Sequence, residues 1–371
     1  MSLEISSLPP PPQISLRTLH MAGLLVDVYG LAELPPHATH VSCLWLHHQR
    51  TRNKEYMADI AARCVGAWNN HHRYQQQQQE GEGAEDSGKG AGNGKRNRGL
   101  IALAYDQRNH GTRLVSELAN ASWREGNAMH AVDMFGVVEG MVADQMVLID
   151  LVEGYLFHDY DGGVKRTVDQ HLALGVSLGG HSVWQLMFAE PRVEAGAVII
   201  GCPDFMYLLS DRARLSRLAT YSAQDNGASF LGSKDFPPSL VEACGKKDPK
   251  GIFFGTAAVP DRAPSGPTDE AARKILRERL RGKKLLLCFG GDDKLVPYRC
   301  SEPFLRWFKE AAGSWFKDEN VSIDDKVYPG IGHAFSADMV TDSVQFVVSV
   351  VAGAGERTSA GGKDEQRVSK I

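Results

Sequence analysis

Short apolar runs rich in β-branched residues alternate with longer amphipathic segments along most of this 371-residue chain. The first two runs adjoin and predict a hairpin, whereas helical patterns separate most of the later runs. This alternation is typical of a mostly parallel sheet with helices on both faces. The sequence therefore predicts an α/β protein with eight strands. The expected strands are Ile14–Met21, Leu24–Tyr29, His40–Leu46, Leu100–Tyr105, His171–Val176, Ala195–Gly201, Lys284–Phe289 and Val321–Val327.

Helical periodicity fills most of the gaps between these runs, in a single α/β domain that we expect to span residues 1–371. Residues 204–282 break the alternation, because helical fragments are separated there by turns rich in Pro and Gly. We interpret them as a small helical cap inserted between the sixth and seventh strands. The expected helices of the main layers are Lys54–Trp68, Ala128–Phe157, Leu178–Ala189, Pro303–Trp315 and Phe335–Val351.

Two segments have the composition of disordered chain. Residues 68–99 contain five consecutive glutamines, Gln75 to Gln79, followed by a stretch rich in Glu, Gly, Ala, Lys and Asn. Because no large apolar residue anchors that stretch, we predict a disordered insertion between a helix and a strand. Residues 359–371 are similarly polar and predict a flexible tail.

The overall charge is nearly balanced, with 41 Lys plus Arg against 45 Asp plus Glu. A nucleic-acid partner would favour a basic excess, so we expect none. The first twelve residues resemble no signal peptide, and no stretch approaches the roughly 18 uncharged apolar residues of a membrane span, so no membrane insertion is expected. We expect a cytoplasmic protein, with the peroxisome as the alternative because Ser369-Lys370-Ile371 is close to a peroxisomal address.

Cysteine and histidine spacing gives no indication of a metal site. The six cysteines are scattered, several of them in apolar runs, and none forms a CxxC pair or a Cys/His cluster. We therefore expect reduced cysteines that pack in the core, and no structural metal.

The pentapeptide Gly175-Val176-Ser177-Leu178-Gly179 follows a predicted strand and opens a predicted helix. A serine at a turn this sharp is raised above the sheet edge, and residues two positions away have no room for side chains. Gly175 and Gly179 meet that requirement. The context predicts that Ser177 is a nucleophile.

A serine nucleophile at neutral pH needs a base, and the base needs a carboxylate to orient it. His333 follows the last predicted strand and is the only histidine after residue 293. Asp293 is our choice of acid, because the spacing to Val296 and Pro297 places those two at the entry to the next helix. Asp292 and, less directly, Asp204 remain alternatives.

Acyl transfer also needs backbone amides that hold the developing oxyanion. The amide of Leu178 follows from the geometry of the turn. For the second donor we choose the amide of Gln49, in the turn after the third predicted strand. That turn lacks the glycines usual at this place.

These motifs together resemble the α/β-hydrolase superfamily, in particular its cytosolic esterases and prolyl-oligopeptidase-like serine hydrolases. The likeness rests on the segments 175–181, 293–297 and 332–335, and on 106–113, which looks like a D-x-R-x-H-G loop. It departs from the pattern where His47-His48 stands in place of the common His-Gly. The resemblance implies a serine nucleophile, no cofactor and an active site beneath the cap.

Other charged and polar residues fit structural roles better than catalytic ones. We expect Asp106, Arg108 and His110 to tie loops together, and His181 to pack or hydrogen-bond on the helix behind Ser177. The arginines between 273 and 281 fit a solvated helix face better than an anion site.

The sequence thus predicts a serine hydrolase that cleaves a small-molecule carboxylic ester or related acyl bond through Ser177, His333 and Asp293. Three alternatives keep the fold: an acyltransferase, a peptidase, or a non-catalytic binding protein. A small-molecule acyl compound is the expected partner. Its identity and the oligomeric state of the protein do not follow from the sequence.

Overall fold

An eight-stranded sheet organises the chain in a computed structural model that describes residues 8–82, 98–159, 164–261 and 270–360. The strands are β1 (Leu16–Met21), β2 (Leu24–Tyr29), β3 (His40–His47), β4 (Arg98–Tyr105), β5 (Thr167–Val176), β6 (Val193–Ile199), β7 (Lys284–Gly290) and β8 (Ser322–Tyr328). Their order in the sheet is β1-β2-β4-β3-β5-β6-β7-β8. The pairs β1–β2 and β2–β4 are antiparallel, and the remaining neighbours are parallel. The predicted fold class is confirmed.

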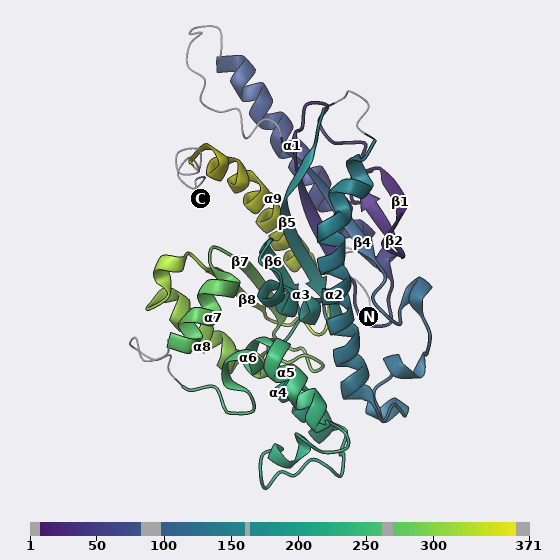
Figure 1. Cartoon of the computed structure of the whole chain (residues 1–371), viewed down its shortest axis with the longest axis vertical. Helices are drawn as coiled ribbons and strands as arrows, with labels where there is room; N and C mark the ends of the chain where they lie inside the picture. Colours follow the sequence, from purple (N-terminus) through teal and green to yellow (C-terminus); the bar gives the residue numbers. More distant parts are fainter. Residues whose placement is uncertain (1–7, 83–97, 160–163, 262–269, 361–371) are drawn as a thin grey trace, which may run out of the picture.

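Helices cover both faces of this sheet (Figure 1). The α-helices are α1 (Ala58–Glu82), α2 (His130–Phe157), α3 (Leu178–Ala189), α4 (Phe205–Leu215), α5 (Pro238–Lys247), α6 (Pro249–Phe254), α7 (Glu270–Leu280), α8 (Glu302–Gly313) and α9 (Ala337–Ala360). Short 3₁₀ helices are η1 (Lys54–Met57), η2 (Gly111–Arg113), η3 (Leu118–Asn120), η4 (Trp123–Glu125), η5 (Ala228–Phe230), η6 (Tyr298–Cys300) and η7 (Lys317–Glu319).

Strand β3 shows why the sheet has two apolar faces. Successive side chains of a strand point to opposite sides, so a central strand covered by helices is apolar at both sets of positions. Cys43 and Trp45 join the core shared with α2, α3, α7 and α8. Leu44 and Leu46 join the core shared with α1 and α9. This double burial explains the uninterrupted apolar run in the sequence.

Helix α1 corrects the expected disordered insertion. Residues 68–82, which we assigned to disorder, continue the helix that begins at Ala58, and β4 begins at Arg98 within the predicted segment. Glutamine is a good helix former, so a helix anchored by Ile60, Val65 and Trp68 can continue through the glutamine run. Residues 83–97 and the predicted tail after residue 360 lie outside the described residues.

The cap is smaller than the predicted segment 204–282. Phe205 of α4 and the buried Phe230 and Phe236 form a separate apolar cluster that also contains Leu178. Helices α4 and α5 and the loop between them gather at the lower end of the molecule (Figure 1). Helix α7 is not part of this cap, because Leu276 and its other buried residues pack into the sheet core. The apolar period of α7 is the same in either location, so the sequence did not distinguish them.

Helix α9 also departs from expectation. Its segment Ala337–Ala354 is long and apolar enough to match a membrane-spanning helix in length and composition, although we expected no such stretch. The packing of the helix gives a different reason for its apolar character. Met339, Val347 and Val350 are buried against the sheet in the core shared with α1.

The six cysteines are buried and unpaired, as expected from their apolar surroundings. Burial raises the pKa of Cys43 and Cys64 above the ordinary thiol range, which keeps these groups protonated.

Candidate active site

Ser177 occupies a sharp turn between β5 and α3. Its backbone has φ 55° and ψ −111°, a conformation that residues with a side chain rarely adopt. A Cβ atom on Gly175 would lie 2.1 Å from the carbonyl oxygen of Gly179, and a Cβ on Gly179 would lie 2.1 Å from the carbonyl oxygen of His47. Both glycines are therefore required by contact with backbone, as the pentapeptide predicts.

Three side chains from separate loops meet at the carboxyl edge of the sheet. Ser177 Oγ lies 2.8 Å from His333 Nε2. His333 Nδ1 lies 2.6 Å from Asp293 Oδ2. His333 belongs to the loop between β8 and α9, and Asp293 follows β7. Parallel strands end at the same edge, which is why residues 177, 293 and 333 converge although they are far apart in the chain.

Asp293 is the acid that contacts His333, and neither of the two alternatives does so among the described contacts. Its Oδ1 accepts hydrogen bonds from the amides of Leu295 and Val296 at 2.8 and 2.9 Å. Burial alone would raise the pKa of Asp293, but the bond and charge of His333 and these two amides outweigh it and lower the pKa. Asp292 is exposed, and Asp204 caps α4 by accepting from the amide of Tyr207.

A pocket of about 510 Å³ opens beside Ser177 and His333. Its walls come from the loop Gln49–Arg52, from residues between Glu117 and Glu125 around η3 and η4, and from Leu295. Gln49 thus lies at the same pocket as Ser177, where we expected the second oxyanion donor. Leu178 is the first residue of α3, and the first amides of a helix have no partner within the helix.

The pocket walls differ from the expected arrangement beneath the cap. Among the described residues, no side chain of α4, α5 or α6 lines this pocket. Residues between Glu117 and Glu125 form one of its walls instead, a position that their sequence did not predict. The capping box in that segment, where Ser122 and Glu125 bond reciprocally, is the sequence signal that could have indicated an ordered loop there.

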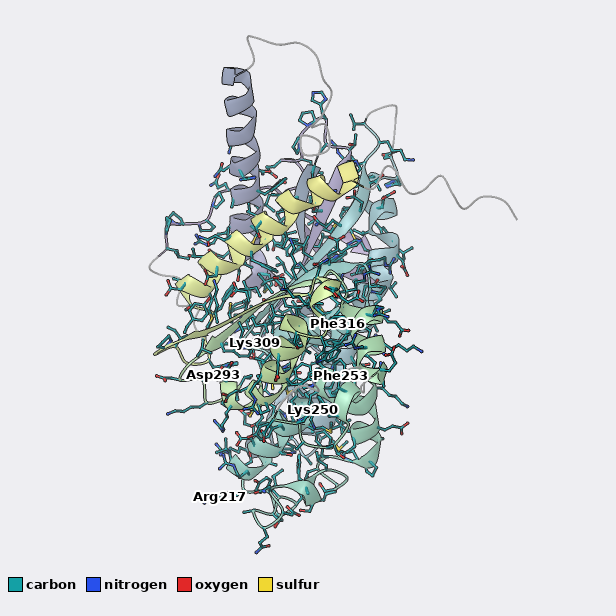
Figure 2. All side chains as sticks on the ribbon, turned by 90° about the vertical axis from the view of Figure 1, so that its left-hand side faces the viewer. Arg217, Lys250, Phe253, Asp293, Lys309 and Phe316 are labelled. Carbon is teal, nitrogen blue, oxygen red and sulfur yellow. The ribbon has the colours of Figure 1, made fainter. Side chains whose placement is uncertain are left out.

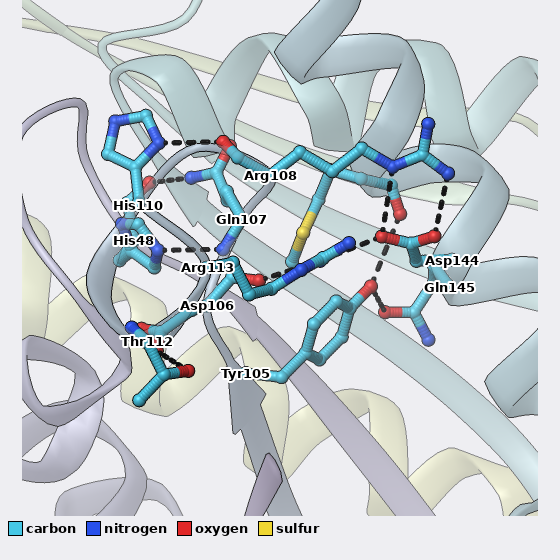
Figure 3. Close-up of polar contacts among 11 residues, drawn as sticks. His48, Tyr105, Asp106, Gln107, Arg108, His110, Thr112, Arg113, Asp144 and Gln145 are labelled. Atoms are coloured by element: carbon cyan, nitrogen blue, oxygen red, sulfur yellow. Dashed lines mark hydrogen bonds and ion pairs between the residues drawn. The ribbon is translucent and has the colours of Figure 1, made fainter. Parts of the chain in front are cut away.

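His48 explains how the turn after β3 holds its shape without a glycine (Figure 3). Its Nδ1 lies 2.7 Å from the carbonyl oxygen of Gln49, and its Nε2 accepts from the amide of Gln107 at 3.0 Å. The Gln107 side-chain amide donates in turn to the carbonyl oxygen of His48. The buried imidazole therefore joins the Gln49 turn to the loop after β4.

The 106–113 loop is a bracing element, as expected (Figure 3). Asp106 accepts from the amides of Lys54 and Thr112, at 2.9 and 2.8 Å. Arg108 and Arg113 both pair with Asp144 of α2, each at 2.8 Å. These contacts connect the loop after β3, the loop after β4 and helix α2.

His181 and the arginines of α7 form contacts that stabilise the fold. His181 Nδ1 accepts from the amide of Cys202 at 3.0 Å, on the helix behind Ser177. Arg277 and Arg281 pair with Glu319 at 2.7 and 3.1 Å. These positions agree with the structural roles that we expected.

The buried imidazole of His48 predicts a loss of stability in acid. Burial lowers its pKa to about 4, against about 6.5 for a solvated histidine. Between these values the unfolded chain binds more protons than the folded protein, so stability falls as the pH falls. For one such histidine the loss between pH 7 and pH 5 is about 2 kcal/mol.

The measurement is urea unfolding of the wild type and His48→Gln at both pH values. The variant should lose less free energy of unfolding on acidification than the wild type, by about 2 kcal/mol. His37→Gln is the control for loss of a histidine, because His37 is exposed. An equal acid effect in wild type and His48→Gln would contradict the prediction.

Comparison with known proteins gives likenesses of overall shape only. No protein-family model and no curated protein matches this chain. Among solved structures it is similar to TT1662 from Thermus thermophilus, with 14% identity, coverage of 92% of this chain and 99% of that one, and a TM-score of 0.47. An esterase/lipase from an uncultured bacterium shares 12% identity over 96% and 89%, with a TM-score of 0.43. A puromycin-hydrolyzing peptidase of Mycobacterium tuberculosis shares 14% over 92% and 39%, with a TM-score of 0.44.

Likenesses at these identities do not identify a substrate. The fold follows instead from the strand order and from the turn at Ser177. The parallel strands β3 to β8 carry their loops to a common edge, and Ser177 stands on a sharp turn directly after β5. A strand, such a turn and a helix in succession are the context of a nucleophile elbow. With the sheet order and the helices on both faces, they give this chain the α/β-hydrolase fold.

Proposed function

We propose that the protein is a serine hydrolase that cleaves a small-molecule carboxylic ester or a related acyl bond. The observation that carries this proposal is the continuous hydrogen-bonded series from Ser177 through His333 to Asp293 beside an open pocket. Each member supplies what the one before it needs. The serine is a weak nucleophile, His333 is a base 2.8 Å away from it, and Asp293 is an acid that orients the base.

In the proposed reaction Ser177 Oγ attacks the acyl carbon while His333 Nε2 takes the serine proton. The charge that develops on the acyl oxygen would be held by the amides of Leu178 and Gln49. His333 then donates the proton to the leaving group, and an acyl-enzyme remains. Asp293, kept ionised by its own hydrogen bonds, stabilises the imidazolium during both transfers. Water, deprotonated by His333, releases the acid and restores Ser177.

Two of the three alternative functions need the same series of Ser177, His333 and Asp293, and the third does not. An acyltransferase would pass the acyl group from Ser177 to an alcohol or thiol, and a peptidase would release an amine. A non-catalytic binding protein has no need for three side chains aligned at hydrogen-bonding distances. We therefore favour an enzyme, without a cofactor, that acts on a small acyl substrate in the cytoplasm. The tripeptide Ser369–Ile371, on which the peroxisomal alternative depends, lies outside the described residues.

Labelling with a fluorophosphonate probe tests the proposed nucleophile. The probe phosphonylates an activated serine, so peptide mapping should find it on Ser177. His333→Gln should slow labelling by roughly 10³-fold or more, because the serine then has no base. Product analysis with and without an added alcohol separates hydrolysis from acyl transfer. Absence of labelling in a folded wild type would contradict the mechanism.

A further inference from the structure

Arg50 places an unpaired guanidinium at the pocket beside Ser177. The residue follows Gln49, is half-buried and lines the same pocket as Ser177 and His333. Its Nη1 is buried and has no hydrogen-bond partner among the described residues. Within the same residues Arg50 forms no ion pair. Guanidinium donors buried without partners are costly, so a site of this kind favours a ligand that supplies acceptors.

Arg212 of α4 adds a second positive charge behind the pocket wall. Its Nη2 donates to the carbonyl oxygen of Leu295 at 3.2 Å, and Leu295 lines the pocket. Its Nη1 lies 3.1 Å from the sulfur of Met134, a weak acceptor. No carboxylate of the described residues pairs with it. Burial, followed by the charge of Arg50, lowers the pKa of Arg212 to about 10, which still leaves it charged at neutral pH.

Two acidic residues, Glu125 and Glu117, also line the pocket. Glu125 Oε2 accepts from the amide of Ser122 at 2.8 Å in the capping box, and its charge acts on Arg50 without an ion pair between the two described residues. Glu117 lines the pocket and is exposed. The remaining cation of the wall, Arg52, donates to the hydroxyl of Tyr56 at 2.9 Å. Within the described residues, Arg50 is thus the arginine of the pocket wall with a buried donor that has no hydrogen-bond partner.

We propose that Arg50, with Arg212 behind it, binds a carboxylate carried by the substrate, so that the preferred ester is a negatively charged one. The planar guanidinium offers two parallel donors that match a carboxylate. This inference rests on the proposed function, because it names the substrate class of the same site. The carboxylate can be carried by the acyl part or by the leaving group, and the two sources are separate arms of the test.

Matched ester pairs measure the effect of charge in each arm. For the acyl part, the mono-para-nitrophenyl ester of glutarate is compared with para-nitrophenyl valerate. For the leaving group, para-carboxyphenyl butyrate is compared with para-carbamoylphenyl butyrate. The wild type should hydrolyse the anionic member of at least one pair with the higher kcat/KM, by roughly 10-fold or more.

Arg50→Gln should lower kcat/KM for that anionic ester by roughly 10- to 100-fold, and clearly more than for its neutral partner. Arg50→Lys keeps the charge but loses the planar fork, so an intermediate loss is expected. Arg217→Gln is the matched control, because Arg217 is exposed and lies at the far lower end of the molecule from Asp293 (Figure 2). It should leave both ratios as in the wild type.

Equal kcat/KM for the anionic and neutral esters in both arms would overturn the inference while leaving the hydrolase proposal intact. So would equal losses on both members of a pair in Arg50→Gln. Calorimetric titration of Ser177→Ala with glutarate tests the anion site without turnover. Binding that weakens at least 10-fold in Ser177→Ala/Arg50→Gln supports the site even if no ester is cleaved, and the failure would then belong to the proposed chemistry. No glutarate binding, with no charge preference in turnover, would contradict the site itself.

Discussion

Ser177→Ala is expected to lower kcat/KM for ester cleavage by roughly 10⁴-fold or more. The hydroxyl is the proposed nucleophile, and within the described residues it is the one hydroxyl that contacts the base His333. The protein should remain folded, because Ser177 Oγ contacts His333 at the open pocket and alanine removes only that atom. The measurement is steady-state hydrolysis of para-nitrophenyl esters together with circular dichroism.

Ser182→Ala is the matched control for that variant. Ser182 lies one turn further along α3 and donates to the carbonyl oxygen of Leu178 at 3.2 Å, without contact to the triad. Its loss should change kcat/KM by only a few fold. Activity of folded Ser177→Ala close to that of the wild type would exclude the proposed mechanism.

Gly179→Ala should prevent the site from assembling. The added Cβ would lie 2.1 Å from the carbonyl oxygen of His47, where real Cβ atoms essentially never approach. Because the obstacle is backbone at the end of β3, no side-chain rotation relieves the clash. We expect the free energy of unfolding to fall by about 3 kcal/mol or more, with loss of activity as the Gln49 turn shifts. Urea unfolding monitored by fluorescence measures the change.

Gly154→Ala separates this clash from the general effect of adding a methyl group to a helix. Gly154 lies in α2, and a Cβ there would meet no atom within 4 Å. Alanine should stabilise that helix by roughly 0.5 to 1 kcal/mol. If both variants changed stability by the same amount, the proposed contact with His47 would not be the cause of the effect.

Local sequence patterns predicted the elements that have strong and unambiguous signals. The segments Leu24–Tyr29 and Leu178–Ala189 have the same bounds in the structure as in the prediction. The role of the glycines around Ser177 could be predicted because a sharp turn restricts the residue type at these positions directly. Asp293 and His333 could be proposed because each follows a predicted strand, and parallel strands bring such loops to one edge.

Segment boundaries that depend on distant contacts were predicted less well. Helix α7 has an apolar period that suits either a cap or a sheet-covering layer, and only its contacts place Leu276 in the sheet core. The glutamine run continues α1 because that helix is anchored upstream, at Trp68 and before. In both cases the local pattern was compatible with two environments.

The sequence by itself determined the α/β alternation, the turn at Ser177 and the order of the three proposed triad residues, since these follow from local periodicity and residue type. Tertiary structure alone decided which side chains surround the nucleophile. Arg50 is one of several arginines in the sequence, and its distinction is a buried Nη1 without a partner beside Ser177. Whether an arginine has a hydrogen-bond or ion-pair partner depends on residues that are distant in the chain. Local sequence therefore does not predict it.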